Sequence, residues 1–140
     1  MPRNRKSRKL LIVSGAFAAV CFLVFTIWII HEANIGRDNI LFKTVRATPY
    51  GDKIGHFLLA GFLTLIANFL LKSRVLTLGR LRLPWGSLVI LVLVIAEESS
   101  QYYLPTRSLD IWDAVANFAG ILVFTLPTLY YVRSRRRDAS

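Results

Sequence analysis

The sequence predicts an all-α membrane protein, a single domain built as a bundle of four transmembrane helices, and three observations support this prediction. Of the 140 residues, 54% are hydrophobic, and the mean hydropathy is +0.49. The apolar residues form long runs whose lengths approach the roughly 20 residues that a helix needs to cross a bilayer. The basic residues lie in short blocks between these runs, as the topology signals of membrane proteins do.

The first span is predicted at residues 10–30, after a basic tail at residues 1–9. No charge interrupts this run, and an α-helix of this length covers about 30 Å. The run is longer than the core of a signal peptide, and it ends near the bulky Trp28 without a clear small-residue cleavage site. We therefore expect this helix to stay in the membrane.

The second span is predicted at residues 54–71, after a polar loop at residues 31–53. Only His56, Thr64 and Asn68 interrupt its apolar character. Asp52 lies just before this run, where a carboxylate can accept backbone N–H groups, so we expect Asp52 to cap the helix.

The third span is predicted at residues 84–103 and is unusual. Its purely apolar part, residues 85–96, would cover only about 18 Å of a bilayer core of about 30 Å. To cross the membrane, the helix must continue through Glu97, Glu98 and Gln101. Carboxylates are then expected inside the membrane, near one end of the span.

The fourth span is predicted at residues 111–132, followed by a basic tail at residues 133–140. The two tails and the loop before the third span hold thirteen of the 18 Lys and Arg residues, and the other two loops hold five. Because cytoplasmic loops carry the excess of Lys and Arg, both chain ends are expected in the cytoplasm. The net charge is +10, but no helix-turn-helix, zinc-finger or RNA-binding pattern accompanies it, so we predict no nucleic-acid partner.

This topology would bring polar residues of three spans to the outer end of the bundle. Within each span their spacing follows the helical repeat, so each set forms a stripe on one helix face. An ionised carboxylate inside a span costs about 2.5–3.5 kcal/mol, and such groups are expected to face the bundle interior or a water-filled cavity. We therefore predict an outward-facing polar pocket formed by Asp52, Lys53, His56, Glu98, Gln101, Arg107, Asp110, Asp113 and Asn117. A hydrogen-bonded clamp between the helices is the alternative.

The charges of this pocket favour some ligands over others. Five carboxylates, with Glu97 included, stand against only Lys53 and Arg107, which leaves three negative charges if all are ionised. A bare phosphate would be repelled, whereas a divalent cation, a cationic group or shared protons would relieve the repulsion. The sequence identifies no definite cofactor, and the one candidate that it offers is a divalent metal, with His56, Glu98 and Asp113 as candidate ligands.

The sequence resembles the VanZ-like family of bacterial membrane proteins over residues 52–120, about half of the chain. The resemblance rests on four short motifs in this order: Asp52-Lys53-x-x-His56-Phe57, Glu98-x-x-Gln101, Pro105-Thr106-Arg107 and Asp110-x-x-Asp113-x-x-x-Asn117-x-x-Gly120. The family more often has glycine where Thr106 stands. The founding member is linked to low-level teicoplanin resistance, so the resemblance implies a cell-envelope protein of the bacterial cytoplasmic membrane.

Three hypotheses for function follow. The first is a protein that binds a small ligand, an ion or a cell-envelope lipid from outside and alters susceptibility to glycopeptides such as teicoplanin. The second is a metal-assisted hydrolase or transferase that acts on a lipid-linked substrate. The third is a small channel or transporter, which at 140 residues would need to assemble as a homo-oligomer. Whether the protein is an enzyme is left open, because no HExxH motif and no glycine-rich phosphate loop is present.

Overall fold

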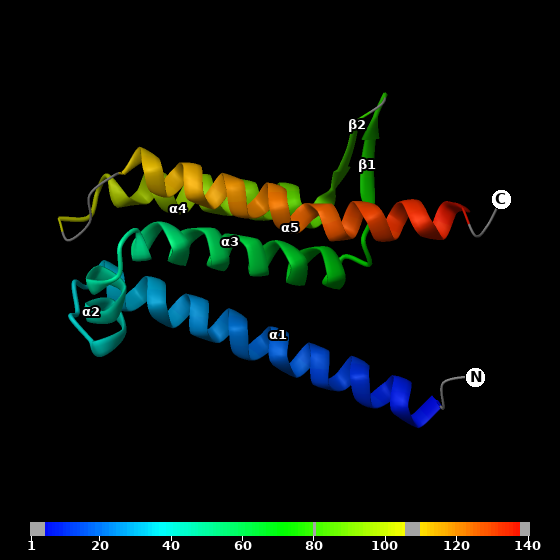
Figure 1. Ribbon diagram of the computed structural model, residues 1–140, viewed down its shortest axis with the longest axis horizontal. Coiled ribbons are helices and arrows are strands. Elements are labelled where there is room, and N and C mark those ends of the chain that lie inside the picture. Colours follow the sequence, from blue (N-terminus) through cyan, green and yellow to red (C-terminus); the bar gives the residue numbers. More distant parts are fainter. Residues whose placement is uncertain (1–4, 80, 106–109, 138–140) are drawn as a thin grey trace.

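The structure is a computed structural model, and it describes residues 5–79, 81–105 and 110–137 (Figure 1). Its elements, in chain order, are α1 (Arg5–Asn34), α2 (Ile40–Ala47), α3 (Gly51–Leu70), β1 (Val75–Leu78), β2 (Leu81–Pro84), α4 (Trp85–Gln101) and α5 (Ile111–Arg137). Helices α3, α4 and α5 pack side by side, and α1 runs next to α3.

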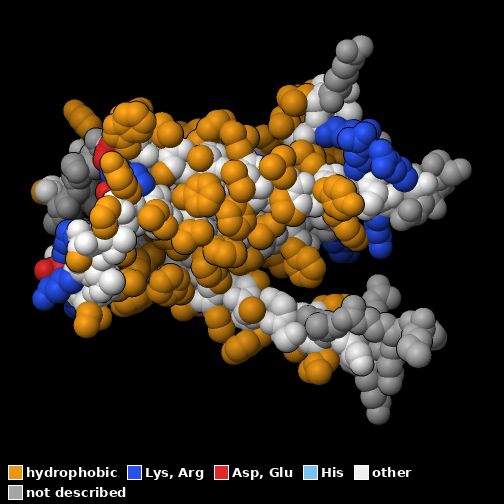
Figure 2. Space-filling model, in the orientation of Figure 1, with side chains coloured by type: hydrophobic (Ala, Val, Ile, Leu, Met, Phe, Trp, Pro, Cys, Tyr) orange, Lys and Arg blue, Asp and Glu red, His pale blue; other side chains and the backbone are white. Residues whose placement is uncertain are grey.

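Three helices of the described residues are long and apolar enough to cross a membrane. The candidate spans are Ile12–Asn34 in α1, Gly51–Leu70 in α3 and Ile111–Arg135 in α5. Large hydrophobic side chains cover the sides of the bundle (Figure 2). Because water would not tolerate so much exposed apolar surface, the surroundings of this helical protein are a lipid bilayer.

Helix α4 differs from the third span that the sequence predicts. It has 17 residues and ends at Gln101, so it covers about 25 Å instead of the predicted length from residue 84 to residue 103. It contains both Glu97 and Glu98, as predicted, and lies along α3 and α5 (Figure 1). A fourth crossing of the membrane by α4 therefore stays a prediction.

The connections contain more structure than the sequence analysis expected, and the described chain is not purely helical. The basic segment before α4 folds into an antiparallel hairpin, in which Val75 pairs with Pro84 and Leu78 pairs with Leu81. Gly79 lies in the hairpin turn at φ +60°, a left-handed conformation that glycine adopts without strain. The loop before α3 holds the short helix α2, which Asn39 caps through its side chain.

Helices α3 and α5 approach each other closely because glycines face the contact. A Cβ atom on Gly120 would lie 2.2 Å from the carbonyl oxygen of Phe57, and one on Gly61 would lie 2.5 Å from the ring of Phe124. Such small residues allow transmembrane helices to pack backbone against backbone. Gly120, the last residue of the fourth motif, thus serves helix packing.

A second group of polar residues links α3, α4 and α5 near the hairpin end of the bundle. Asn68 donates a hydrogen bond from its side-chain amide to the hydroxyl of Ser87 at 3.0 Å and accepts one from the backbone N–H of Ser87 at 3.1 Å. The Ser87 hydroxyl also lies 2.7 Å from the hydroxyl of Thr125. All three residues are buried, so these bonds join the three helices within the apolar interior.

The two ends of the bundle differ in composition. The hairpin, the beginning of α1 and the end of α5 lie at one end (Figure 1), where Lys and Arg side chains gather around the hairpin and the end of α5 (Figure 2). The opposite end holds α2, the beginnings of α3 and α5 and the end of α4. The described members of the predicted polar pocket belong to this second end.

Candidate functional site

The first turn of α3 supplies two charged side chains. The helix begins after Tyr50, which is left-handed at φ 56° and makes no side-chain cap bond. The prediction that Asp52 caps this helix is therefore wrong, because Asp52 already lies within the first turn. Its carboxylate instead accepts hydrogen bonds from the backbone N–H of Lys53 at 2.9 Å and from the Lys53 ammonium at 2.7 Å.

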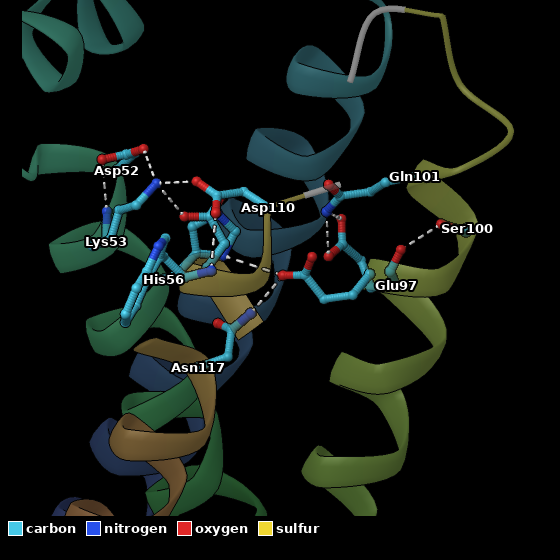
Figure 3. A network of polar contacts seen from close by, with 11 residues as sticks. Asp52, Lys53, His56, Glu97, Ser100, Gln101, Asp110 and Asn117 are labelled. Atoms are coloured by element: carbon cyan, nitrogen blue, oxygen red, sulfur yellow. Dashed lines mark hydrogen bonds and ion pairs between the residues drawn. The ribbon is translucent and has the colours of Figure 1, made fainter. Parts of the chain in front are cut away.

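Lys53 is the centre of the exposed part of the site (Figure 3). Its Nζ atom donates to Asp110 Oδ2 at 2.5 Å and lies 2.9 Å from Asp113 Oδ1, in addition to its bond with Asp52. The hydrogen bond from Lys53 lowers the pKa of Asp110 below its ordinary value. One ammonium group thus holds the beginning of α5 against the beginning of α3.

The three aspartates around Lys53 have the spacing of a metal site. One carboxylate oxygen from each of Asp52, Asp110 and Asp113 lies within 4.8 Å of the others. Oxygen ligands of this kind suit hard divalent cations. However, the Lys53 ammonium contacts all three carboxylates, so the protein supplies a positive charge of its own at this point.

His56 lies one turn further into α3 and faces carboxylates of two other helices. Its Nδ1 atom is 3.8 Å from Glu98 Oε1 of α4, and its Nε2 atom is 3.6 Å from Asp113 Oδ2 of α5. Both distances are longer than a direct hydrogen bond. Because the two carboxylates face different nitrogens of one ring, the three candidate metal ligands form a row instead of surrounding one point.

Glu98 is the most buried carboxylate of this row. Its Oε1 atom accepts a hydrogen bond of 2.8 Å from the side-chain amide of Asn117 (Figure 3). Only 8% of its side chain is exposed, against 52% for Asp52 at the outer end of the group. The polar residues therefore lead from the end of the bundle into its interior.

Gln101 pairs with Glu97, one of the two glutamates that lie within helical reach of it. It is buried, and its amide donates to both carboxylate oxygens of Glu97 at 3.1 and 3.0 Å. The four-residue spacing of Glu97 and Gln101 was visible in the sequence, but Glu97 was not included in the predicted pocket. Arg107, which was included, lies outside the described residues.

The structure therefore brings seven of the nine predicted site residues into one group. We call this group the acidic cluster: Asp52, Lys53, His56, Glu98, Asp110, Asp113 and Asn117. Three helices contribute to it, and its members are joined by ion pairs or hydrogen bonds. No family model matches the chain, and neither a curated protein nor a solved structure matches it.

Proposed function

We propose that this chain is a VanZ-like integral membrane protein whose acidic cluster binds a cationic group of an envelope molecule from outside the cell. The observation that carries the proposal is the convergence of Lys53, Glu98 and Asp113 from three different helices. Three of the four motifs on which the resemblance rests are far apart in the sequence, and residues from each of the three meet in this cluster. A shared site gives a physical reason for their order and spacing.

The proposed topology has four crossings, with both chain ends in the cytoplasm and the acidic cluster outside. Helix α4 has exposed aromatic residues at both ends, Trp85 at one and Tyr102 and Tyr103 just beyond the other. Trp and Tyr are enriched at the two membrane–water interfaces, which supports a crossing by α4. The basic residues at the hairpin end support the cytoplasmic location of that end.

The charge of the acidic cluster selects the class of ligand. It contains four carboxylates and one ammonium group, so it carries three negative charges when all are ionised and His56 is neutral. An anionic group would be repelled from it, whereas an ammonium group would be attracted and could donate hydrogen bonds to the carboxylates. Since Lys53 already contacts all three outer aspartates, Glu98 and His56 are the members that we expect to contact the ligand.

Binding is tested with a water-soluble amine. Ethanolamine is titrated into the purified protein in a neutral detergent, and binding is followed by calorimetry. We expect the wild-type protein to bind it and Glu98→Gln to bind it much more weakly, because the variant keeps the size of the side chain and loses its charge. Ser100→Ala, at an exposed position two residues further along α4, is the matched control and should bind as the wild type does. Equal binding by wild type and Glu98→Gln would refute the proposed function.

The cellular role is tested by drug susceptibility. The wild-type chain and Glu98→Gln are produced at equal membrane levels in a bacterium that teicoplanin inhibits. If the role implied by the family resemblance holds, the wild-type chain raises the inhibitory concentration of teicoplanin and the variant does not. An unchanged inhibitory concentration for both proteins would contradict a role in glycopeptide susceptibility. It would not affect the conclusion drawn from the binding of ethanolamine.

A metal-assisted hydrolase or transferase acting on a lipid-linked substrate is the second candidate. It is favoured by the three aspartate oxygens that lie within 4.8 Å of one another. For a divalent metal to bind there, the Lys53 ammonium must move away, so Lys53→Met should increase metal affinity. Calorimetric titration of Mg²⁺ and Mn²⁺ into wild type and Lys53→Met tests this, and absence of binding by both proteins would exclude these metals.

A further inference from the structure

A hollow between α4 and α5 connects the acidic cluster with the side of the helix bundle. It has a volume of about 460 Å³, within the range of ligand-binding pockets. Besides Glu98, its walls are Leu91, Val94, Ile95 and Ser99 of α4 and Ala114 and Phe118 of α5. We call it the lateral groove.

Glu98 belongs both to the acidic cluster and to the lining of the lateral groove. Along the helix axis, Leu91 lies about 10 Å from Glu98, on the side away from the acidic end of the bundle. The lateral groove therefore begins at a carboxylate, and its apolar walls continue along the two helices. Ile95 and Phe118 in its walls are exposed on the sides of helices that the bilayer surrounds.

We propose that the lateral groove holds an acyl chain of a membrane lipid whose primary-amine headgroup is bound at Glu98. This inference rests on the proposed function, since it takes the cationic group to be an ammonium and adds that its carrier is a lipid. The apolar walls match a hydrocarbon chain, and the carboxylate at their outer end matches an ammonium group. Such a lipid reaches the site sideways from the outer leaflet.

Charge complementarity distinguishes this lipid from other occupants of the groove. A lipid with a net negative headgroup would be repelled by the carboxylates of the acidic cluster. A choline headgroup is cationic but carries no N–H group, so it cannot donate a hydrogen bond to Glu98. A wholly water-soluble amine would leave the apolar part of the groove unused.

The test uses the full-length chain in neutral detergent and three lipids with identical acyl chains. Binding of phosphatidylethanolamine, phosphatidylcholine and phosphatidylglycerol is measured by native mass spectrometry, and binding of soluble ethanolamine is measured by calorimetry. Ala114→Phe fills the groove with a ring, and Val115→Phe is its matched control. Val115 is the next residue of α5, is exposed and does not line the groove. Ala114→Leu is a milder second variant, for use if Ala114→Phe fails to fold.

We expect the wild type to prefer phosphatidylethanolamine over the other two lipids. Ala114→Phe should weaken the binding of phosphatidylethanolamine about tenfold, the factor that corresponds to 1.4 kcal/mol, and should leave the binding of ethanolamine unchanged. Val115→Phe should change the binding of neither phosphatidylethanolamine nor ethanolamine, and Glu98→Gln should weaken the binding of both.

Two results would overturn the inference. If Ala114→Phe and Ala114→Leu both bind phosphatidylethanolamine as the wild type does, the groove does not hold the chain. If the wild type binds all three lipids equally, the headgroup is not recognised as an amine. In either case, loss of ethanolamine binding by Glu98→Gln would leave the proposed function intact, whereas unchanged ethanolamine binding by that variant would refute the proposed function itself.

Discussion

Two substitutions of Glu98 separate its role in the fold from its role as a charge. Glutamine keeps a side-chain oxygen that can accept the hydrogen bond from Asn117, whereas leucine removes the acceptor from a buried position. A hydrogen bond to a charged group contributes about 1.5–3 kcal/mol and a neutral one about 0.5–1.5 kcal/mol. Glu98→Gln should therefore lose about 1 kcal/mol of hydrogen bonding.

This loss is opposed by a gain, because the glutamine variant no longer holds an ionised group within the bundle. An ionised carboxylate at the centre of a span costs about 2.5–3.5 kcal/mol, and the cost is smaller near a helix end, where Glu98 lies. The two contributions are of similar size, so the free energy of unfolding of Glu98→Gln should lie within about 1 kcal/mol of the wild-type value. Glu98→Leu also removes the charge, but it leaves the buried amide of Asn117 without this acceptor, at a cost of about 1–3 kcal/mol.

The assay is thermal unfolding of the purified proteins in one detergent at one pH, followed by circular dichroism. For a chain of this size, 1 kcal/mol corresponds to roughly 2–4 °C in Tm. We expect the Tm of Glu98→Gln to be close to that of the wild type and the Tm of Glu98→Leu to be several degrees lower. If the Tm of Glu98→Gln falls as far as that of Glu98→Leu, the charge of Glu98 itself stabilises the contact between the helices. The reasoning that assigns this charge to ligand binding would then be wrong.

Three further predictions concern the rest of the bundle. Ser87→Ala removes hydroxyl contacts to two other helices and should cost about 1 kcal/mol, whereas Ser99→Ala, whose hydroxyl bonds only its own helix, should cost almost nothing; thermal unfolding of the two variants compares them. Gly120→Ala should destabilise by about 1–3 kcal/mol because its Cβ meets a neighbouring backbone oxygen, whereas Gly55→Ala should be neutral or stabilising because nothing lies within 4 Å of its Cβ; equal melting temperatures would contradict the close approach of α3 and α5. The lysine hydrogen bond lowers the pKa of Asp110, so its stabilisation is present above the ordinary carboxylate pKa of about 3.9 and is lost as the pH falls through the lower pKa of the folded state. The difference in Tm between wild type and Asp110→Asn should thus stay constant from pH 8 to about pH 5 and shrink in stronger acid, and a difference that shrinks above pH 5 would contradict the assignment.

Hydrophobicity located the longest helices but not all of their ends, because α1 (Arg5–Asn34) and α5 (Ile111–Arg137) both continue into the basic segments beyond the predicted runs. The run that the sequence analysis assigned to residues 54–71 is α3 (Gly51–Leu70), and the run assigned to residues 111–132 lies within α5 (Ile111–Arg137). A segment inside a bilayer must be apolar and must satisfy its own backbone hydrogen bonds, so composition alone indicates such helices. The short elements gave no comparable signal. The hairpin before α4 and the helix α2 depend on local turns and contacts that periodicity does not reveal.

The polar residues of the site could be found from the sequence because they are rare inside apolar runs. Polar groups that interrupt a span indicate a site or a buried contact, and this observation led to His56, Glu98 and Asn117. The partner of Gln101 was harder to predict. Both Glu97 and Glu98 lie within helical reach of Gln101, and only the rotation of α4 against its neighbours decides which of them it meets.

The sequence by itself determined that this is a helical membrane protein and identified most of the polar residues that gather at one end of its bundle. Hydrophobic length and the helical rise depend only on local composition, so they require no knowledge of the packing. The tertiary structure decided that Lys53 lies among three aspartates, that His56 lies between Glu98 and Asp113, and that a groove leads from Glu98 along α4 and α5. These features depend on how three helices rotate and approach one another, and that is set by contacts between residues that are distant in the chain.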